Sequence, residues 1–345
     1  MAGHAFESPP SWRGRPYELF SEHTLSVGNP SSIRGLLDCT LREGSYKTAF
    51  SLRDCARIAR SLAGTGVRFV EVGVERDGDS RAPHSTGDYL RAVAEAAPAM
   101  TPGIFAMASS APLEAIEAAV AAGARFVRIG AEATELEAAS PLVAKVKAMG
   151  VTVAVNAMKS HTLPTEGLVA AAVELTNAGA DLFYLVDSAG CMFPDTVRSL
   201  TETLVECGAA VGFHGHDNLT LAVANSLAAL VGGAVAVDGT LRGAGRSAGN
   251  AQLEVLAVAA GKLGLLPGFD TDLLAAAAEQ IVTPILATDR GVSRLDLLLG
   301  ATGCHSDWGE HASQIADRNG TPLPGLLALL ARHPAEKPSL PPPNA

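Results

Sequence analysis

The stretch Val211-Gly-Phe-His-Gly-His-Asp-Asn218 carries both the fold signal and the chemistry of this chain. It begins as a short apolar strand and places two imidazoles, His214 and His216, two positions apart. Side chains at positions i and i+2 of a strand lie on one face, roughly 6–7 Å apart. Two neutral imidazoles at that spacing suit a metal ion, although a lone strand histidine is more often a core residue. The metal interpretation therefore needs a third ligand.

Seven other apolar runs of this kind lie along the chain, starting near residues 36, 69, 103, 126, 152, 182 and 234. Ala- and Leu-rich helical segments separate them, such as 112–122, 165–177, 195–207 and 219–231. Strands alternating with single helices predict parallel pairing, and continuously apolar strands predict burial on both faces. The spacing of about 28 residues per unit is close to the ~31 of an eightfold barrel. We predict an α/β fold, a (β/α)8 TIM barrel, with an open doubly wound sheet as the alternative.

The barrel is expected to occupy residues 31–265, preceded by a polar, Pro-containing extension at 1–30. Within it, Ser51 is expected to cap a helix whose apolar residues recur at helical spacing from Leu52 to Leu62. A helical C-terminal segment follows at 266–335, with helices expected at 271–282, 307–319 and 324–332. We expect this segment to close the site or to make partner or dimer contacts. The last ten residues, 336–345, form a Pro-rich tail.

Composition narrows the class of protein. With 48% hydrophobic and 18% charged residues, the 345-residue chain suits a compact soluble enzyme. Its formal net charge of −10 disfavours nucleic acid and anionic membranes as partners. The N-terminus has no apolar signal-peptide core, which favours a cytoplasmic location. Five cysteines, an odd number without a C-x-x-C motif, favour reduced thiols over a disulfide framework.

Active sites of TIM barrels lie at the C-terminal ends of the strands. Strands 1 and 7 of a closed eightfold barrel are separated only by strand 8, so Glu43 after strand 1 can face His214 and His216. Two imidazoles and one carboxylate with open positions form a site for Mn²⁺, Zn²⁺, Co²⁺ or Fe²⁺. Other polar residues at these strand ends are Asn156, Lys159, His161, Asp187, Ser188 and Asn250.

Several of these residues have a plainer explanation. Asp38 lies in mid-strand and is expected to be structural rather than a ligand. Asp187 is a candidate for orienting a ligand from behind. Lys159 invites a Schiff-base interpretation, but it lies past its strand in a loop. The glycine-rich loop 243–249 has room for a phosphate, although a tight turn that presents Asn250 is favoured because the spacing is wrong for a dinucleotide fingerprint.

Beyond single residues, whole motifs resemble a known superfamily. The segment Leu37-Asp-Cys-Thr-Leu-Arg-Glu-Gly44 resembles the D-x-T-L-R-D-G opening of the metal-dependent HMG-CoA lyase and isopropylmalate synthase superfamily, also called pyruvate-carboxyltransferase-type or DRE-TIM. The segments 212–219 and 243–254 match two more of its signatures. The stretches 158–164, 184–190, 216–226 and 249–255 are similar to the 4-hydroxy-2-oxovalerate aldolase branch. The resemblance runs from about residue 36 to residue 330.

This resemblance implies a divalent-metal-dependent (class II) aldolase, a carbon–carbon lyase. Its substrate would be a 4-hydroxy-2-oxo acid. The enzyme would cleave this acid to pyruvate (or another 2-oxo acid) and an aldehyde, or form it from them, through a metal-stabilised enolate. The expected ion would be Mn²⁺, with Zn²⁺, Co²⁺ or Mg²⁺ as alternatives. By the same resemblance, Glu43, His214 and His216 would bind the metal and Asn250 would bind or approach it. Arg42 would grip the 2-oxo acid and stabilise its enolate, and Ser188 would help to hold pyruvate.

Two departures from the family pattern concern the same site. The family nearly always has Asp at the position of Glu43, and one extra methylene moves the carboxylate by more than about 1 Å. Aldolases of the branch usually have His where this chain has Tyr46, and Tyr where it has His305. The two residue types are exchanged relative to the pattern of the branch. We therefore expect His305 to be the catalytic base, since an ordinary imidazole titrates near neutrality, and Tyr46 to donate a hydrogen bond.

Relatives of the branch often dock an acylating aldehyde dehydrogenase, and the helices after Gly268 are the expected docking surface. A homo-oligomer is also expected. The alternative function with the same metal site is a Claisen-type acyl-CoA synthase or lyase, of the isopropylmalate or homocitrate synthase or HMG-CoA lyase kind. A non-catalytic scaffold is a third possibility, given the changes at Glu43 and Tyr46.

Overall fold

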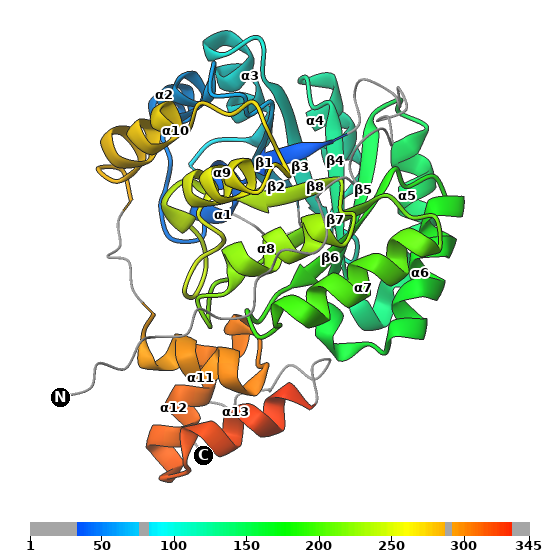
Figure 1. Ribbon diagram of the computed structural model, residues 1–345, viewed down its shortest axis with the longest axis vertical. Coiled ribbons are helices and arrows are strands. Elements are labelled where there is room, and N and C mark those ends of the chain that lie inside the picture. The colour runs from blue at the N-terminus through cyan, green and yellow to red at the C-terminus, as the bar shows by residue number, and fades with distance from the viewer. Residues whose placement is uncertain (1–32, 76–82, 287–291, 333–345) are drawn as a thin grey trace, which may run out of the picture. The chain divides into compact units, whose positions relative to one another are not determined.

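The computed structural model describes residues 33–75, 83–286 and 292–332, and eight parallel strands within them close into a barrel (Figure 1). The strands are β1 (Gly35–Asp38), β2 (Phe69–Glu75), β3 (Thr101–Met107), β4 (Phe126–Glu132), β5 (Thr152–Met158), β6 (Leu182–Asp187), β7 (Val211–Gly215) and β8 (Ala236–Gly239). Strand β1 pairs in parallel with both β2 and β8, which closes the sheet. The TIM barrel prediction is confirmed, and the open sheet is wrong. The predicted N-terminal extension and Pro-rich tail lie outside the described residues.

Helices follow the strands. They are α1 (Thr40–Gly44), α2 (Leu52–Leu62), α3 (Thr86–Ala96), α4 (Leu113–Ala121), α5 (Ser140–Lys147), α6 (Thr165–Asn177), α7 (Pro194–Glu206), α8 (Ala222–Val231) and α9 (Leu253–Lys262). Ser51 caps α2 as predicted: its hydroxyl accepts from the Asp54 amide, and the Asp54 carboxylate accepts from the Ser51 amide. This capping box satisfies two amides that the first helical turn leaves unpaired. None of the described helices is long and apolar enough to cross a membrane.

Two hydrophobic cores hold the barrel. The larger lies between the strands and the surrounding helices, and the smaller includes Leu37, Phe69, Phe126, Leu182 and Tyr184. The Phe69 and Phe126 rings pack edge to face, with centroids 6.3 Å apart. Gly212 on β7 leaves room for the Tyr184 ring, since a Cβ there would lie 2.5 Å from it.

The C-terminal segment divides its packing between two cores. Helix α10 (Thr271–Ala276) and the π-helix η5 (Ala277–Val282) contribute buried residues to the larger barrel core. Helices α11 (Arg294–Thr302), α12 (Gly309–Asn319) and α13 (Leu323–Ala331) share a core of their own around Leu299, Cys304 and Trp308. The predicted boundary at residue 265 remains a prediction.

Helix α11 was not predicted, although its sequence carries a signal for its start. Ser293 and Asp296 form a capping box at the N-terminus of the helix. At the other end Gly303 adopts the left-handed conformation, with φ +69°, that suits a C-terminal cap.

Candidate metal centre and active site

Glu43, His214 and His216 come together at the C-terminal end of the barrel. Each residue offers one possible ligand atom, an imidazole nitrogen or a carboxylate oxygen, and these three atoms all lie within 4.8 Å of one another. All three side chains are buried. Glu43 Oε1 is 3.8 Å from His214 Nε2, and the two imidazole centroids are 5.3 Å apart. Strand β8 alone separates β1 from β7, as expected for a closed barrel of eight strands. Two imidazoles and a carboxylate in this arrangement can bind a divalent cation.

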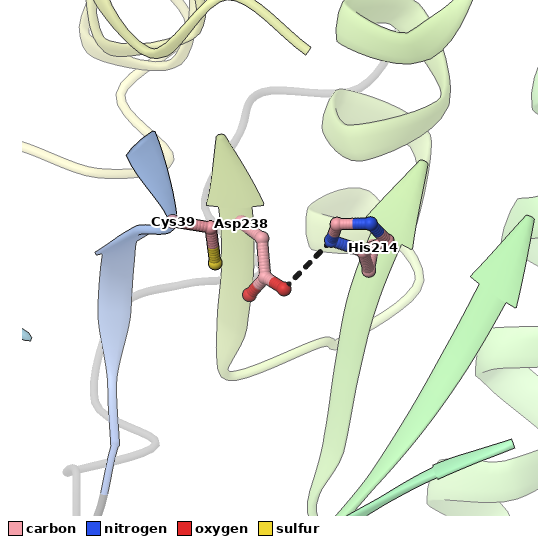
Figure 2. A group of neighbouring side chains, drawn as sticks. All are labelled: Cys39, His214 and Asp238. Atoms are coloured by element: carbon pink, nitrogen blue, oxygen red, sulfur yellow. Dashed lines mark hydrogen bonds and ion pairs between the residues drawn. The ribbon is translucent and has the colours of Figure 1, made fainter. Parts of the chain in front are cut away.

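A carboxylate on β8 fixes the orientation of His214. Its Nδ1 lies 2.9 Å from Asp238 Oδ2, and Figure 2 shows this contact. A carboxylate accepts hydrogen bonds, so Nδ1 donates and the lone pair of the neutral ring lies on Nε2, the atom nearer Glu43. Burial, with the Arg42 and Arg128 charges, holds the pKa of His214 well below its usual range. The ring is therefore neutral at physiological pH, as a metal ligand must be.

Two buried oxygen atoms at this site lack hydrogen-bond partners among the described residues: Glu43 Oε2 and Asn250 Oδ1. Asn250 is held by a β-bridge to His216, and its Nδ2 donates to the Ala244 carbonyl at 2.9 Å. A Cβ on Gly245 would collide with Asn250 Nδ2, so a larger residue there would displace the Asn250 amide. Unpaired buried oxygens are costly unless something binds them. Both atoms fit a cation, which supports Asn250 as a fourth candidate ligand.

The glycine-rich loop that presents Asn250 closes on itself. The Gly249 amide donates to the Arg246 carbonyl at 2.7 Å, and the Asn250 amide donates to the Gly243 carbonyl at 3.1 Å. Gly249 has φ +90°, and a Cβ there would collide with the Gly243 carbonyl. Because these amides bond within the loop, the geometry favours the tight turn over the phosphate loop.

Helix α1 carries Arg42 and Glu43, and Asp38 anchors its first turn. The Asp38 carboxylate accepts from the Thr40 amide at 3.1 Å and from the Thr40 hydroxyl at 2.6 Å, in keeping with the expected structural role. Arg42 donates through Nη1 to Glu43 Oε1 and through Nε to Glu71 Oε2 at 2.5 Å. Its guanidinium stacks 4.6 Å from the Phe105 ring centroid. A guanidinium has five N–H donors, so Arg42 keeps further donors for an anionic substrate.

A second arginine inside the barrel was missed by sequence reasoning. Arg128 on β4 is fully buried and donates through Nη2 to Asp238 Oδ2 at 2.5 Å. Its Nη1 lies 3.5 Å from Glu71 Oε1, and its guanidinium stacks 4.3 Å from the Tyr184 ring centroid. The sequence does carry a signal: Glu71, Arg128 and Asp238 are charged residues flanked by apolar residues within buried strands. Such residues are rarely fully buried unless they pair with one another.

The structure places Tyr46 and His305 in one network of contacts. Arg246 lies over the Tyr46 ring, 4.6 Å from its centroid, and donates to Asp307 Oδ1 at 2.9 Å. His305 is buried, and its Nδ1 lies 3.3 Å from both the amide and Oδ2 of Asp307. Burial lowers the pKa of His216, and the charges of His214, Arg246 and His305 add to that effect in this order. Tyr46 and His305 are thus joined through Arg246 and Asp307.

The remaining candidates stabilise loops at the strand ends. Ser188 Oγ accepts from the Lys159 amide at 2.9 Å, and Lys159 Nζ pairs with Glu132 Oε2 at 3.0 Å. That ion pair disfavours a free amine for a Schiff base. The Asp187 carboxylate accepts from the amides of Cys191 and Met192 at 3.0 and 2.9 Å. By this geometry Asp238, rather than Asp187, orients a candidate ligand.

Comparison with known proteins assigns the family. A profile of the HMGL-like family matches residues 35–281. The chain belongs to the HMGL-like family. It is 37% identical to 4-hydroxy-2-oxovalerate aldolase 2 of Nocardia farcinica, an alignment that covers 89% of this chain and 91% of that relative. It is 35% identical to 4-hydroxy-2-oxovalerate aldolase of Thermus thermophilus, over 90% of this chain and 92% of that relative. The resemblance found in the motifs is confirmed.

Solved structures agree on the barrel of this HMGL-like chain. The N-terminal domain of a putative aldolase from Bacteroides vulgatus superposes with a TM-score of 0.72 at 24% identity, covering 83% of this chain and 98% of that one. HMG-CoA lyase of Bacillus subtilis superposes with a TM-score of 0.65 at 18% identity, covering 75% and 96%. At these identities the likeness concerns the fold alone.

A neighbouring group in this HMGL-like barrel shares His214 with the metal candidates. Figure 2 shows Cys39, His214 and Asp238, whose ligand atoms also lie within 4.8 Å of one another. Arg128 already supplies the positive charge there, since its Nη1 is 3.3 Å from Cys39 Sγ and its Nη2 bonds Asp238. Burial raises the pKa of the Cys39 thiol, so it stays protonated. This group therefore orients His214 and is not a second metal site.

Replacing Arg128 with Met is expected to destabilise the fold by about 3 kcal/mol, because the buried Asp238 carboxylate would lose its ion pair and Glu71 would keep only Arg42. Urea unfolding followed by circular dichroism measures the loss. Arg198→Met is the matched control, since Arg198 pairs with Glu202 on the surface, where such pairs contribute little. Equal stability of the two variants would contradict the importance of the buried network.

Proposed function

We propose that this chain is a class II aldolase. It cleaves a 4-hydroxy-2-oxo acid to pyruvate or another 2-oxo acid and an aldehyde, or forms the acid from these two compounds. One observation carries the proposal: Glu43, His214, His216 and Asn250 present ligand atoms at the barrel mouth, and two of their oxygens are buried without partners in the described structure. The proposal also has the support of relatives, named 4-hydroxy-2-oxovalerate aldolases, that align along about nine-tenths of both chains.

The donor set supports Mn²⁺ as the ion, with Zn²⁺, Co²⁺ or Mg²⁺ as alternatives. Carboxylate and amide oxygens suit Mn²⁺, and the two imidazoles suit it better than Mg²⁺. When bound, the ion supplies Lewis-acid polarisation of the 2-oxo group and of the enolate oxygen. Glu43, His214, His216 and Asn250 would hold it.

The charge balance of the buried residues supports an anionic substrate. Arg42 and Arg128 contribute +2, and Glu43, Glu71 and Asp238 contribute −3, so the contacting group has a net charge of −1 when all are ionised. A divalent cation changes this to +1. A 2-oxo acid with one carboxylate then neutralises the site, which lowers the cost of burying each charge.

The protein residues divide the work of cleavage between them. The free N–H groups of Arg42 bind the substrate carboxylate and face the enolate oxygen as its charge develops. His305 accepts the proton of the C4 hydroxyl, the C3–C4 bond breaks, and its electron pair remains on the 2-oxo acid as an enolate while the aldehyde leaves. Tyr46 donates a hydrogen bond near the reacting oxygen, and Ser188 helps to hold the 2-oxo acid. The same groups serve the reverse condensation.

For His305 to act as a base, its proton must lie on Nδ1. The contact to Asp307 Oδ2 favours this tautomer, whereas the contact to the Asp307 amide favours a proton on Nε2. An approaching hydroxyl that donates to Nε2 selects the first tautomer, and the carboxylate stabilises the imidazolium that forms. The Asp307 carboxylate is thus the group that permits base catalysis.

A coupled assay tests the proposal. The metal-stripped chain is titrated with Mn²⁺ in the presence of 4-hydroxy-2-oxovalerate, and pyruvate release is followed with lactate dehydrogenase and NADH. The aldolase should release pyruvate in proportion to bound metal and without coenzyme A. A Claisen-type enzyme would require an acyl-CoA, and a scaffold would release nothing with either. Screening other aldehydes with pyruvate and 2-oxobutyrate then defines the natural pair.

Partner contacts remain part of this proposal. Leu297 on α11 and Leu329 on α13 expose 52% and 55% of their surface, and such side chains are suited to contacts with another subunit. They support the expected use of the segment after Gly268 for docking an acylating aldehyde dehydrogenase or a second copy of the chain. Co-purification with such a dehydrogenase and the mass of the free protein in solution test the two contacts. We also propose a cytoplasmic location.

A further inference from the structure

Three side chains outside the active site form a second group of metal-binding atoms. They are His161, in the 3-10 helix η3 (Ser160–Thr162) after β5, Asp187 at the end of β6, and Cys191 in the loop that follows. One ligand atom from each lies within 4.8 Å of those of the other two. We propose that these three residues bind a zinc-type divalent cation, Zn²⁺ or Co²⁺, that fixes the turn leading to His305.

The protonation of His161 follows from its contacts. Its Nε2 lies 3.2 Å from the Gly303 carbonyl, and a carbonyl can only accept, so Nε2 carries the proton. In the neutral ring with its proton on Nε2, Nδ1 holds a lone pair. Nδ1 is buried and has no hydrogen-bond partner among the described residues. A buried lone pair without a donor is costly, and a metal ion would satisfy it.

Asp187 and Cys191 complete a mixed donor set. Each Asp187 carboxylate oxygen accepts one amide, from Cys191 or Met192, and the carboxylate also accepts from the Cys191 thiol. Loss of the thiol proton would free that lone pair for a cation. Nitrogen, oxygen and sulfur donors together suit Zn²⁺, at ligand distances of about 2.0–2.3 Å. Ligand atoms of such a tetrahedron lie roughly 3.3–3.8 Å apart, so small side-chain rotations close the observed group. Water would fill the fourth position.

The site differs from the Cys39 group in what surrounds it. An arginine neutralises the Cys39 group, whereas here the nearby Lys159 is engaged with Glu132 at 3.0 Å. His161 and Cys191 are both partly exposed, which gives an ion a route from solvent. A cysteine binds a metal ion as the thiolate, so binding releases the Cys191 thiol proton to solvent.

The position of the site suggests its role. Gly303 is the C-terminal cap of α11 and lies two residues before His305. A Cβ added to Gly303 would lie 3.7 Å from His161 Nε2 and 3.8 Å from Cys191 Sγ, so this turn packs directly on the proposed ligands. An ion there would tie the loops after β5 and β6 to the turn that positions His305. Binding of an ion by His161, Asp187 and Cys191 does not depend on the aldolase proposal. Only the role of the ion in positioning His305 for catalysis rests on that proposal.

Cobalt spectroscopy of the full chain tests the site. A thiolate bound to Co²⁺ gives a charge-transfer band in the near ultraviolet, and the candidate active-site ligands include no sulfur. The metal-stripped wild type should show this band on Co²⁺ titration, and Zn²⁺ should abolish it. Cys191→Ser and His161→Gln should both lose the band. Cys207→Ser, which changes another partly buried thiol, and Glu43→Gln, which removes an active-site ligand, should both retain it.

The outcomes are distinct. A wild type without the band, or a band that survives Cys191→Ser, would overturn the second site. Thermal unfolding of the stripped proteins shows whether each variant is folded. His161→Gln tests the metal site a second time with Cys191 unchanged. Because Glu43→Gln should lose pyruvate release and keep the band, failure of the aldolase proposal can be told apart from failure of the metal site.

Discussion

Glu43→Gln should abolish tight Mn²⁺ binding and lower aldol cleavage by about 10³-fold or more. Removing a single donor that stabilises a developing oxyanion costs about 10²–10³ in kcat, and this variant loses the cation as well. Glutamine replaces an anionic ligand with an amide and also removes the charge that faces Arg42. Isothermal titration calorimetry with Mn²⁺ measures the binding, and the coupled assay measures the rate.

Glu43→Asp is the matched control. It keeps the carboxylate and introduces the aspartate that the family pattern has at this position. The side chain is shorter by one methylene group, so the carboxylate lies farther from the histidines. We expect metal binding to persist and the order of activity with Mn²⁺, Co²⁺ and Zn²⁺ to change, because the position of an oxygen ligand sets the preferred geometry. Full activity and unchanged Mn²⁺ affinity in Glu43→Gln would exclude this carboxylate from the metal centre.

The barrel and the core of the site could be predicted because both follow from short-range rules. Repeating strand and helix segments require parallel pairing, and the i, i+2 rule places His214 and His216 on one face. Closure of the barrel then brings Glu43 to them, because β8 alone separates β1 from β7. These relationships depend on the order of the elements and not on the details of packing.

The parts that could not be predicted depend on contacts between distant segments. Arg128, Glu71 and Asp238 lie on three different strands and meet only through the register of the closed barrel. The contact of His161 with Gly303 joins residues 142 positions apart. Neither the Arg128 network nor the His161 contact follows from local sequence pattern. A charged residue within an apolar strand does indicate that a buried partner exists.

His305→Ala should reduce carbon–carbon cleavage by about 10²–10⁴-fold, the range that a positioned base contributes. The same variant should still exchange the C3 hydrogens of pyruvate with solvent, because water or buffer can accept the C3 proton without His305, and Arg42 and the metal ligands remain in place to stabilise the enolate. Steady-state pyruvate release measures the first property, and proton NMR in D₂O measures the second. Tyr46→Phe is the control, since it removes a hydrogen-bond donor and leaves the base in place. Loss of both activities in His305→Ala would place His305 in binding or enolisation instead.

The pH profile provides an independent test of this role. Burial lowers the pKa of His305, and the Asp307 carboxylate partly opposes that effect. A base must be neutral to act, so kcat/KM should rise with pH and level off, with its midpoint below the ordinary histidine value of about 6.5. Asp307→Asn removes the opposing charge, which lowers the pKa of His305 further and moves the midpoint to lower pH. The plateau should fall as well, because a weaker base accepts the hydroxyl proton less readily and the imidazolium loses its carboxylate. A midpoint that moves to higher pH, or does not move, would show that another group controls the reaction.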